Sequence, residues 1–364
     1  MAAPSFEELL ARPDLAWMGQ NTTHLATPAP VVAALEASIA AREFQLYAPP
    51  PGFARLRELI VEDLGLTGAD AWVTDGAVGG LHQICTVLAP ELSKLITSDP
   101  GWPWPGRFVG LADVPVEALP IYENPGAKLT AAQIAEVIEP RSLIYLIDPL
   151  NPLGSLYSRA ELEATVEVAR AAEAYVVHDA TYRHFADGHT LVADLYPERT
   201  FTTYSFSKWL GLAGLRIGAV VATPELLGRV MRVPANPLGS SIVAERAAIA
   251  GLEHKGPWLT ELRAVNRANL QAVERVVAET GFGRVVVSPS QANLLAIDLG
   301  GTGLDAEAAC AAILERNVFI RPGTYQSVLF GERFVKVSTS VPEEWAARFQ
   351  DAWADLAGRT EATA

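Results

Sequence analysis

Between residues 70 and 222 the sequence alternates short apolar runs with longer amphipathic segments, and this alternation constrains the fold most strongly. Strands alternating with helices predict an α/β fold with a mostly parallel sheet. Several runs are apolar throughout, as expected for strands that helices cover on both faces. The expected strands are AWVT (71–74), KLITS (94–98), LIYLID (143–148), AYVVHD (174–179), FTTYSF (201–206) and IGAVVA (217–222).

Beyond residue 235 the rhythm changes, which predicts a smaller α+β domain. Helical patterns run from about 240 to 280 and again near 342–357. The strand candidates between them are RVVVSP (284–289), NLLAIDL (293–299), VFIRP (318–322) and FVKVS (334–338). At roughly 150 residues per domain, the length of the chain suggests two domains. We expect an N-terminal arm at 1–40 on the small domain or a dimer partner, a large domain at 41–235 and a small C-terminal domain at 236–364.

The charge balance, the lengths of the apolar runs and the positions of the cysteines narrow the class of protein. With 28 Lys and Arg against 42 Asp and Glu, the net charge is −14, which argues against nucleic acids and anionic membranes as partners. No apolar run approaches the roughly 20 residues of a membrane span, and no signal peptide is visible. Cys85 and Cys310 stand far apart, outside any C-x-x-C, and are expected to be reduced thiols. These features together predict a cytoplasmic protein.

Ligands of an open parallel sheet bind beyond the carboxyl ends of its strands, so the residues after each run deserve inspection. The first run leads into DGAVGG, where backbone N–H groups at a helix start could hold a phosphate. Such glycines also serve tight packing alone, and the run is not G-x-G-x-x-G, which argues against a dinucleotide site. After the third run, Asn151-Pro152-Leu153-Gly154 is a pattern that ordinary turns share.

The fourth and fifth runs are followed by ionisable side chains. Asp179 ends an apolar run, and Tyr182 follows three residues later. A buried carboxylate needs a partner, which could be structural or a ligand cation. Lys208 follows the next run in a Ser/Gly-rich turn, and Arg216 lies eight residues further on. A lysine shielded from water can lose its proton and become a nucleophilic amine.

Together these motifs resemble those of the fold-type I pyridoxal-phosphate (PLP) enzymes, specifically the class I/II aminotransferase family. The pattern S-x-S-K-x-x-G-x-x-G-x-R-x-G begins at Ser205, N-P-x-G begins at Asn151, and D-x-x-Y begins at Asp179. All three occur in family order and at family-like spacing, and the resemblance covers about residues 19–345. It implies a large domain with a mostly parallel sheet sandwiched by helices, a small α+β C-terminal domain, and PLP as cofactor.

The resemblance implies a role for each matching position. Lys208 would form a Schiff base with the PLP aldehyde, and its amine, once free, would move a proton. Asp179 would hold the pyridine nitrogen protonated, which makes the ring an electron sink. Asn151 and Tyr182 would hydrogen-bond the 3′-oxygen, and Arg216 would clamp the phosphate with its planar fork.

Further contacts follow from the same resemblance. Trp102 would stack on the PLP ring. Tyr47 would reach the phosphate of a neighbouring subunit, which implies a homodimer with shared active sites. The remaining positions around the phosphate are Gly76, Ala77, Val78, Ser205 and Ser207.

One position departs from the family. Its C-terminal carboxylate clamp is an arginine in a strand reading Y-x-R-[IVL]-S, whereas this chain has FVKVS with Lys336 at that position. An arginine fork binds a carboxylate at two points, but a lysine offers one point charge on a flexible stem. Lys336 either still binds an α-carboxylate or signals another substrate or another broken bond. Arg321 could approach the site, while Arg333 is expected to face away from Lys336.

The WMGQNTTH segment adds candidates for substrate contact. Gly19 resembles the small residue near the substrate carboxylate in the family, and Asn21 and His24 could add contacts. Local turn and capping roles for these residues remain open.

The substrate is therefore expected to be an amino acid, with transamination between the amino acid and a 2-oxo acid as the leading reaction. The alternative, motivated by Lys336, is elimination, replacement or cyclisation in a specialised biosynthetic pathway. A serine acyl-transfer reading of S-F-S-K lacks the S-D-N and K-T-G tripeptides of that class. The six histidines are scattered without H-E-x-x-H spacing, so no metal site is expected.

Overall fold

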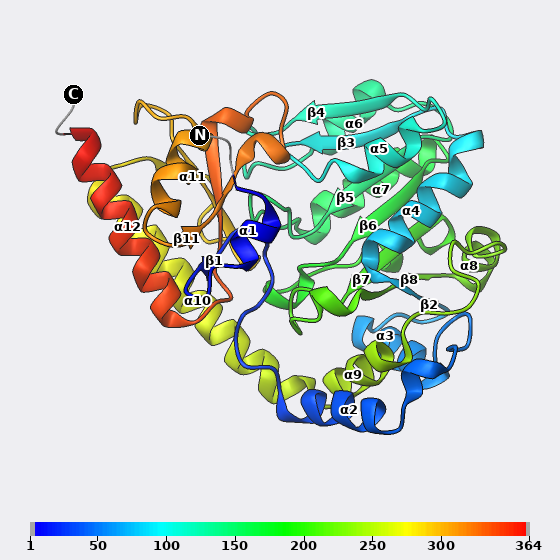
Figure 1. Cartoon of the computed structure of the whole chain (residues 1–364). Coiled ribbons are helices and arrows are strands. Elements are labelled where there is room, and N and C mark those ends of the chain that lie inside the picture. Colours follow the sequence, from blue (N-terminus) through cyan, green and yellow to red (C-terminus); the bar gives the residue numbers. More distant parts are fainter. Residues whose placement is uncertain (1–3, 362–364) are drawn as a thin grey trace.

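A computed structural model describes residues 4–361 as two bodies, a larger one around a seven-stranded sheet and a smaller one around a four-stranded sheet (Figure 1). Residues 1–3 of the predicted arm and 362–364 of the predicted C-terminal domain lie outside this description. The large sheet consists of β2 (Asp70–Asp75), β3 (Leu95–Asp99), β4 (Val116–Pro120), β5 (Leu143–Ile147), β6 (Tyr175–Asp179), β7 (Thr200–Ser205) and β8 (Ile217–Ala222).

The six strands predicted for this sheet all form, each to within a residue at either end, and the predicted α/β fold is confirmed. The strand order is β2-β8-β7-β6-β5-β3-β4. Only β8 runs antiparallel to its neighbours β2 and β7. The carboxyl ends of the other six strands therefore meet at one edge of the sheet, and β8 begins at that same edge.

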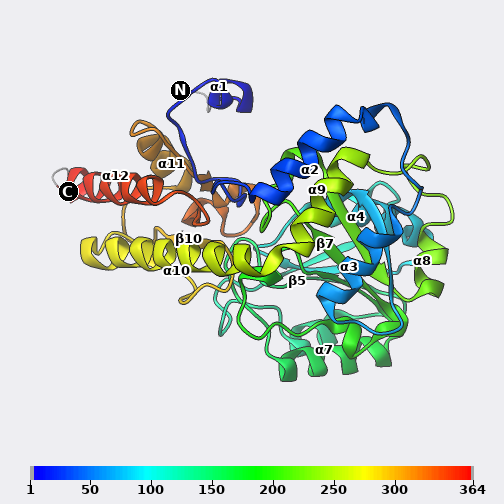
Figure 2. The same cartoon turned by 90° about the horizontal axis from the view of Figure 1, so that it is seen from below.

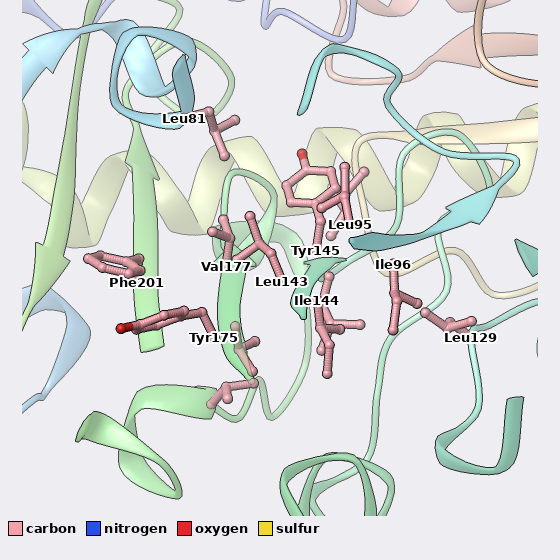
Figure 3. Packing of buried hydrophobic residues seen from close by; sticks show 14 of the residues in the cluster. Leu81, Leu95, Ile96, Leu129, Leu143, Ile144, Tyr145, Tyr175, Val177 and Phe201 are labelled. Carbon is pink, nitrogen blue, oxygen red and sulfur yellow. The ribbon is translucent and has the colours of Figure 1, made fainter. Parts of the chain in front are cut away.

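Helices cover the large sheet on both faces. Figure 2 shows α7 along one side of the molecule and α2 with α9 along the other, with the sheet between them. Leu95, Leu143 and Val177 contribute to the buried core of the sheet, together with Leu81 from a covering helix (Figure 3). The helices of this body are α2 (Ala29–Ala40), α3 (Ala54–Leu64), α4 (Gly76–Leu88), α5 (Trp104–Gly110), α6 (Ala131–Val137), α7 (Arg159–Ala171), α8 (Pro224–Val230) and α9 (Ile242–Glu253).

The small body packs helices against the antiparallel sheet β12-β13-β10-β9. Its strands are β9 (Arg284–Val285), β10 (Leu294–Asp298), β12 (Arg321–Pro322) and β13 (Phe334–Ser338), and its helices are α10 (Lys255–Thr280), α11 (Ala306–Leu314) and α12 (Glu343–Glu361). The predicted strand VFIRP divides in two. Its first half, β11 (Val318–Phe319), pairs instead with β1 (Ala16–Trp17), which follows the short helix α1 (Phe6–Leu10).

The packing divides the predicted segments 1–40 and 236–364 between the two bodies. In the arm, β1 pairs with the small body, whereas α2 lies against α9 beside the large one (Figure 1). In the C-terminal segment, Ala244 and Ala247 of α9 share a core with α3 and the large sheet. Trp258 and Leu262 of α10 belong to that core as well, so the chain crosses to the small body within α10. A helical periodicity that runs on without interruption does not reveal such a crossing.

Among residues 4–361, no helix combines the length and the apolar character that a membrane crossing requires.

Candidate active site

The edge where the strands of the large sheet end carries a cavity of about 320 Å³, within the range of small-molecule sites. Asp179 and Ser205 are the last residues of β6 and β7, and Arg216 directly precedes β8. Sequence-predicted residues that line the cavity are Asn21, Ala77, Val78, Trp102, Asn151, Asp179, Tyr182, Ser205, Ser207, Lys208, Arg216 and Lys336. The fold thus brings together side chains from one end of the chain to the other.

Three predicted residues do not line this cavity. Gly76 opens α4 at a positive φ of 75°, and a side chain there would collide with the Arg216 guanidinium. Gly19 lies against the ring of Phe319, where a side chain would collide with the ring, so packing accounts for the glycine. Tyr47 is 78% exposed and lies away from the cavity of its own chain.

Asp179 is a buried carboxylate with four hydrogen-bond donors. Its Oδ1 accepts from Thr181 Oγ1 at 2.6 Å, Thr181 N at 3.1 Å and Thr203 Oγ1 at 2.9 Å. Its Oδ2 accepts from Tyr145 Oη at 2.8 Å. These donors satisfy both oxygens of the carboxylate, and the group lines the cavity, where a ligand cation can meet it.

Lys208 directs its amine into the same cavity. Burial and the nearby Arg216 lower the pKa of this amine to about 8, although Asp179 opposes the shift. Nζ donates to the backbone oxygen of Gln20 at 3.0 Å. An amine with a pKa of about 8 is neutral in about a tenth of molecules at pH 7 and in about half at pH 8, and the neutral form is the one that attacks carbonyl carbon.

A chain of hydrogen bonds fixes which polar atoms of Asn21 and Asn151 face one another. Asn21 N–H donates to Ser338 Oγ at 2.7 Å, and Ser338 Oγ donates to Asn21 Oδ1 at 3.1 Å. Asn21 Nδ2 then donates to Asn151 Oδ1 at 3.2 Å and to Tyr182 Oη at 2.9 Å. Burial raises the pKa of Tyr182, so its hydroxyl keeps its proton. Asn151 Nδ2 and the Tyr182 hydroxyl are therefore left as donors at the cavity.

Positive charge and backbone donors gather where the start of α4 lines the cavity. Ala77 and Val78 stand in the first turn of α4, where N–H groups have no acceptor within the helix. Arg216 adopts a left-handed backbone at φ 53° and lies against Gly76 at the start of that helix. Ser205 and Ser207 add hydroxyls to the same wall. A helix N-terminus with an arginine fork and hydroxyls is suited to a phosphate dianion.

Two cations of the small body, Lys336 and Arg321, face the cavity side by side. They are directly opposed across the β12–β13 ladder, so both side chains leave the sheet on the same face. Burial, Arg321 and Lys208 hold the pKa of Lys336 well below its ordinary value. The Arg321 guanidinium lies 4.1 Å from the centroid of the Tyr325 ring. Within residues 4–361 neither cation has an ion pair.

The other cations and histidines considered from the sequence lie elsewhere. Arg333 pairs with Asp298 and Glu123 and faces away from the cavity. His24 bonds Thr22 Oγ1 at 3.0 Å and contacts Trp345 without lining the cavity.

Several cavity residues escaped the sequence analysis. Gln20, Thr22, Tyr325 and Gln326 line the cavity from loops whose sequences carry no motif. Thr203 reaches Asp179 because β7 pairs with β6 in that register, and a register between strands is not visible in either strand alone.

A buried cluster behind Asp179 joins Asp148, His178 and His189. Asp148 Oδ2 lies 3.5 Å from His178 Nε2 and 3.3 Å from His189 Nε2. However, His178 Nδ1 accepts a hydrogen bond from Val192 N–H at 3.2 Å. A neutral imidazole that accepts at Nδ1 carries its proton at Nε2, where a metal ion would need the lone pair. His178 therefore does not fit as a metal ligand at Nε2, and the hydrogen bond within the cluster joins His189 Nε2 to the backbone oxygen of Asp148 at 3.0 Å.

The combination of this sheet topology with a lysine, an aspartate and a phosphate-type cup at the strand ends defines the class of fold-type I PLP-dependent enzymes. Comparison with known proteins agrees. The family pattern described as "Aminotransferase class I and II" matches residues 13–352. The chain belongs to this family and is a PLP-dependent aminotransferase.

Relatives and solved structures extend over nearly the whole chain. Histidinol-phosphate aminotransferase 1 of Mesorhizobium japonicum is 28% identical over 91% of this chain and 87% of its own. The aspartate/prephenate aminotransferase of Thermus thermophilus is 26% identical over 86% and 83%. The structure of N-succinyldiaminopimelate aminotransferase from Mycobacterium tuberculosis superposes with a TM-score of 0.85 at 24% identity, over 96% of this chain and 95% of that one.

The lowered pKa of Lys208 predicts a pH dependence for its chemical reactivity in the cofactor-free protein. Only the neutral amine reacts, so modification by trinitrobenzenesulfonate should rise as pH increases through about 8. Ordinary exposed lysines should follow only near about 10.4. Peptide mass spectrometry after short pulses measures the modification of Lys208, with a free lysine-containing peptide in the same solution as the comparison. A midpoint for Lys208 equal to that of the free peptide would contradict the shielding described above.

Proposed function

We propose that Lys208 binds PLP covalently and that the enzyme exchanges an amino group between an amino acid and a 2-oxo acid. The observation that carries this proposal is a weakly basic lysine amine and a buried aspartate anion facing one cavity. When bound, PLP supplies an electron sink that stabilises negative charge at the substrate Cα.

The donors of the cavity suit the polar groups of that cofactor. Asp179 can keep a pyridinium proton in place because its oxygens are already fixed by Tyr145, Thr181 and Thr203. Asn151 Nδ2 and the Tyr182 hydroxyl are free to donate to a ring oxygen. These contacts belong to residues that the sheet edge holds rigidly, so they orient the ring before substrate arrives.

Lys208 is suited to proton transfer once substrate has displaced it. Its amine is neutral above a pH of about 8 and can accept the proton from Cα. Burial keeps water from competing for that proton. The nearby Arg216 contributes to the lowered basicity, so the phosphate end and the reacting end of the site are electrostatically coupled.

Arg321 and Lys336 support a substrate that carries an anionic group. Lys336 is buried beside the half-buried Arg321 and its charged form is disfavoured there, and a carboxylate or phosphate between the two side chains would offset that cost. Arg321 supplies the planar fork that Lys336 lacks, and its stacking on Tyr325 holds the fork in one plane. The names of the relatives fit this chemistry, since histidinol phosphate and aspartate both carry such a group.

The replacement of arginine by Lys336 favours a second candidate, namely elimination, replacement or cyclisation of an amino acid. The bond that breaks is the one that stands perpendicular to the cofactor ring, and the anion clamp helps to set that orientation. A single point charge at Lys336 permits more rotation than a fork would.

A half-reaction assay separates the two candidates. The PLP-loaded enzyme, mixed with aspartate, glutamate or histidinol phosphate, should convert cofactor stoichiometrically to pyridoxamine phosphate, and 2-oxoglutarate should restore it. Chromatography of the released cofactor measures this directly. Ammonia release without pyridoxamine phosphate would contradict transamination and favour the second candidate. Lys208→Ala should abolish the conversion, because both the covalent link and the proton carrier are lost.

Removing the Arg321 fork should weaken substrate binding. Arg321→Ala is expected to raise KM for an anionic amino donor about tenfold or more, the effect of losing a charge-assisted hydrogen bond. Lys336→Met should act in the same direction. Arg284→Ala removes an exposed arginine from Asp298, which Arg333 continues to pair, and as the matched control it should leave KM unchanged. Equal KM values for all three variants would exclude the paired cations from the substrate site.

We also propose a homodimer in which Tyr47 completes the site of the partner subunit. Tyr47 is exposed in the single chain, and other exposed apolar side chains flank it on nearby segments. They include Ile39, Phe44, Leu46, Val233 and Leu238. An apolar surface of this kind marks a protein contact.

Complementation tests the shared site. Tyr47→Ala and Lys208→Ala should each be inactive or nearly so. An equal mixture, unfolded and refolded together, should regain about a quarter of wild-type activity, because half of random dimers carry one intact site. Sedimentation velocity establishes the dimer in the same samples. No recovery in mixed dimers would place Tyr47 in the site of its own chain.

A further inference from the structure

Gln326 carries a side-chain contact between the small body and the large one. It lies in the loop between β12 and β13 and is only 5% exposed. Its backbone is fixed at both ends, because N–H donates to Gly323 O at 2.8 Å and O accepts from Gly101 N–H at 2.8 Å. Its side chain then reaches the large body, where Nε2 donates to Asn151 Oδ1 at 2.7 Å.

The loop around Gln326 is held against the large body independently of that contact. Asp99, at the end of β3, accepts from Ser327 Oγ and from Val328 N–H at 3.1 Å. Trp104 Nε1 donates to Tyr325 Oη at 2.9 Å. Loss of the Gln326 amide would therefore leave the loop docked.

Asn151 Oδ1 receives two donors, Asn21 Nδ2 and Gln326 Nε2. The direction of the Asn21 amide is set by its own backbone N–H through Ser338. If the Asn151 amide rotated by half a turn, its NH2 group would face two other NH2 groups and lose both hydrogen bonds. The amide is therefore held with Nδ2 turned away from both donors.

We propose that Gln326 is a positioning residue that fixes the amide of Asn151 as a donor to the cofactor, and so ties cofactor tuning to the docking of the small body. This inference rests on the proposed function, since it assigns to Asn151 a contact with the ring oxygen of PLP. A donor at that oxygen favours its anionic form. With a donor at that oxygen, the neighbouring lysine–cofactor nitrogen loses its proton at a lower pH than it would beside an acceptor.

Gln326→Glu replaces the hydrogen-bond donor that faces Asn151 Oδ1 with an acceptor. A carboxylate accepts hydrogen bonds only, so Asn151 Nδ2 must turn toward it and Oδ1 toward the cofactor oxygen. Asn151 Oδ1 and the cofactor oxygen would then repel each other. A proton retained between the cofactor oxygen and the lysine–cofactor nitrogen relieves this repulsion, so the proton should be kept to a higher pH. The pH midpoint of the visible absorbance of the loaded enzyme, measured without substrate, should rise by about one unit or more, or about 1.4 kcal/mol per unit.

Two controls remove the trivial explanations. Gln291→Glu makes the same charge change in the small body, where Gln291 Oε1 accepts from Asp187 N–H and a carboxylate keeps that bond. It should titrate like wild type. Gln326→Met removes the donor without adding charge and should shift the midpoint less than Gln326→Glu.

A double-mutant cycle with Asn151→Ala separates a route through Asn151 from a direct charge effect. On the Asn151→Ala background the shift caused by Gln326→Glu should fall to a minor fraction of its value in the wild type. A full shift on that background, or no shift in a folded Gln326→Glu enzyme that binds PLP, overturns the inference. Thermal unfolding of the same samples verifies folding. Failure of wild type itself to develop visible absorbance with PLP would instead refute the proposed function.

Discussion

The site depends on one buried charge, the carboxylate of Asp179 at the end of β6. A carboxylate in this position is stable only if donors replace its lost water. The donors come from both neighbouring strands, Tyr145 on β5 and Thr203 on β7, and from the turn at Thr181. The order of the central strands and the polarity of the cavity are thus linked, because the anion could not be satisfied in another strand order.

Most strands of the large sheet were predictable, because a strand that is buried on both faces is a continuous apolar run. β4 was not, since it lies at the edge of the sheet and only Leu119 among its residues is buried. The run RVVVSP was expected to pair over six residues, yet β9 keeps two. Val286 still donates its N–H to Ala296 O at 2.9 Å, and both Val286 and Val287 pack against a core that the large sheet shares with β10. Composition indicated burial correctly but could not say which partner buries them.

The position of the motif residues at one edge of the sheet was predictable for a related reason. Asn151, Asp179 and Lys208 each stand in a short motif that fixes its own turn, and the sheet then brings the turns together. The role of Gln326, in contrast, was not predictable from a local motif. Its role arises from a loop of the small body meeting Asn151, 175 positions away in sequence, and nothing local in either segment announces the contact.

The 26-residue helix α10 joins the two bodies as one rigid rod. At about 1.5 Å per residue it spans about 39 Å. Its first turns are packed through Trp258 and Leu262 into the large body, and its last turns through Val273 and Val277 into the small one. A rod anchored at both ends turns any displacement of the small body into a tilt about the large one. Arg321 and Lys336 stand on paired strands of the small sheet, so any such tilt would move both of them together relative to Asp179 and Lys208 of the large body.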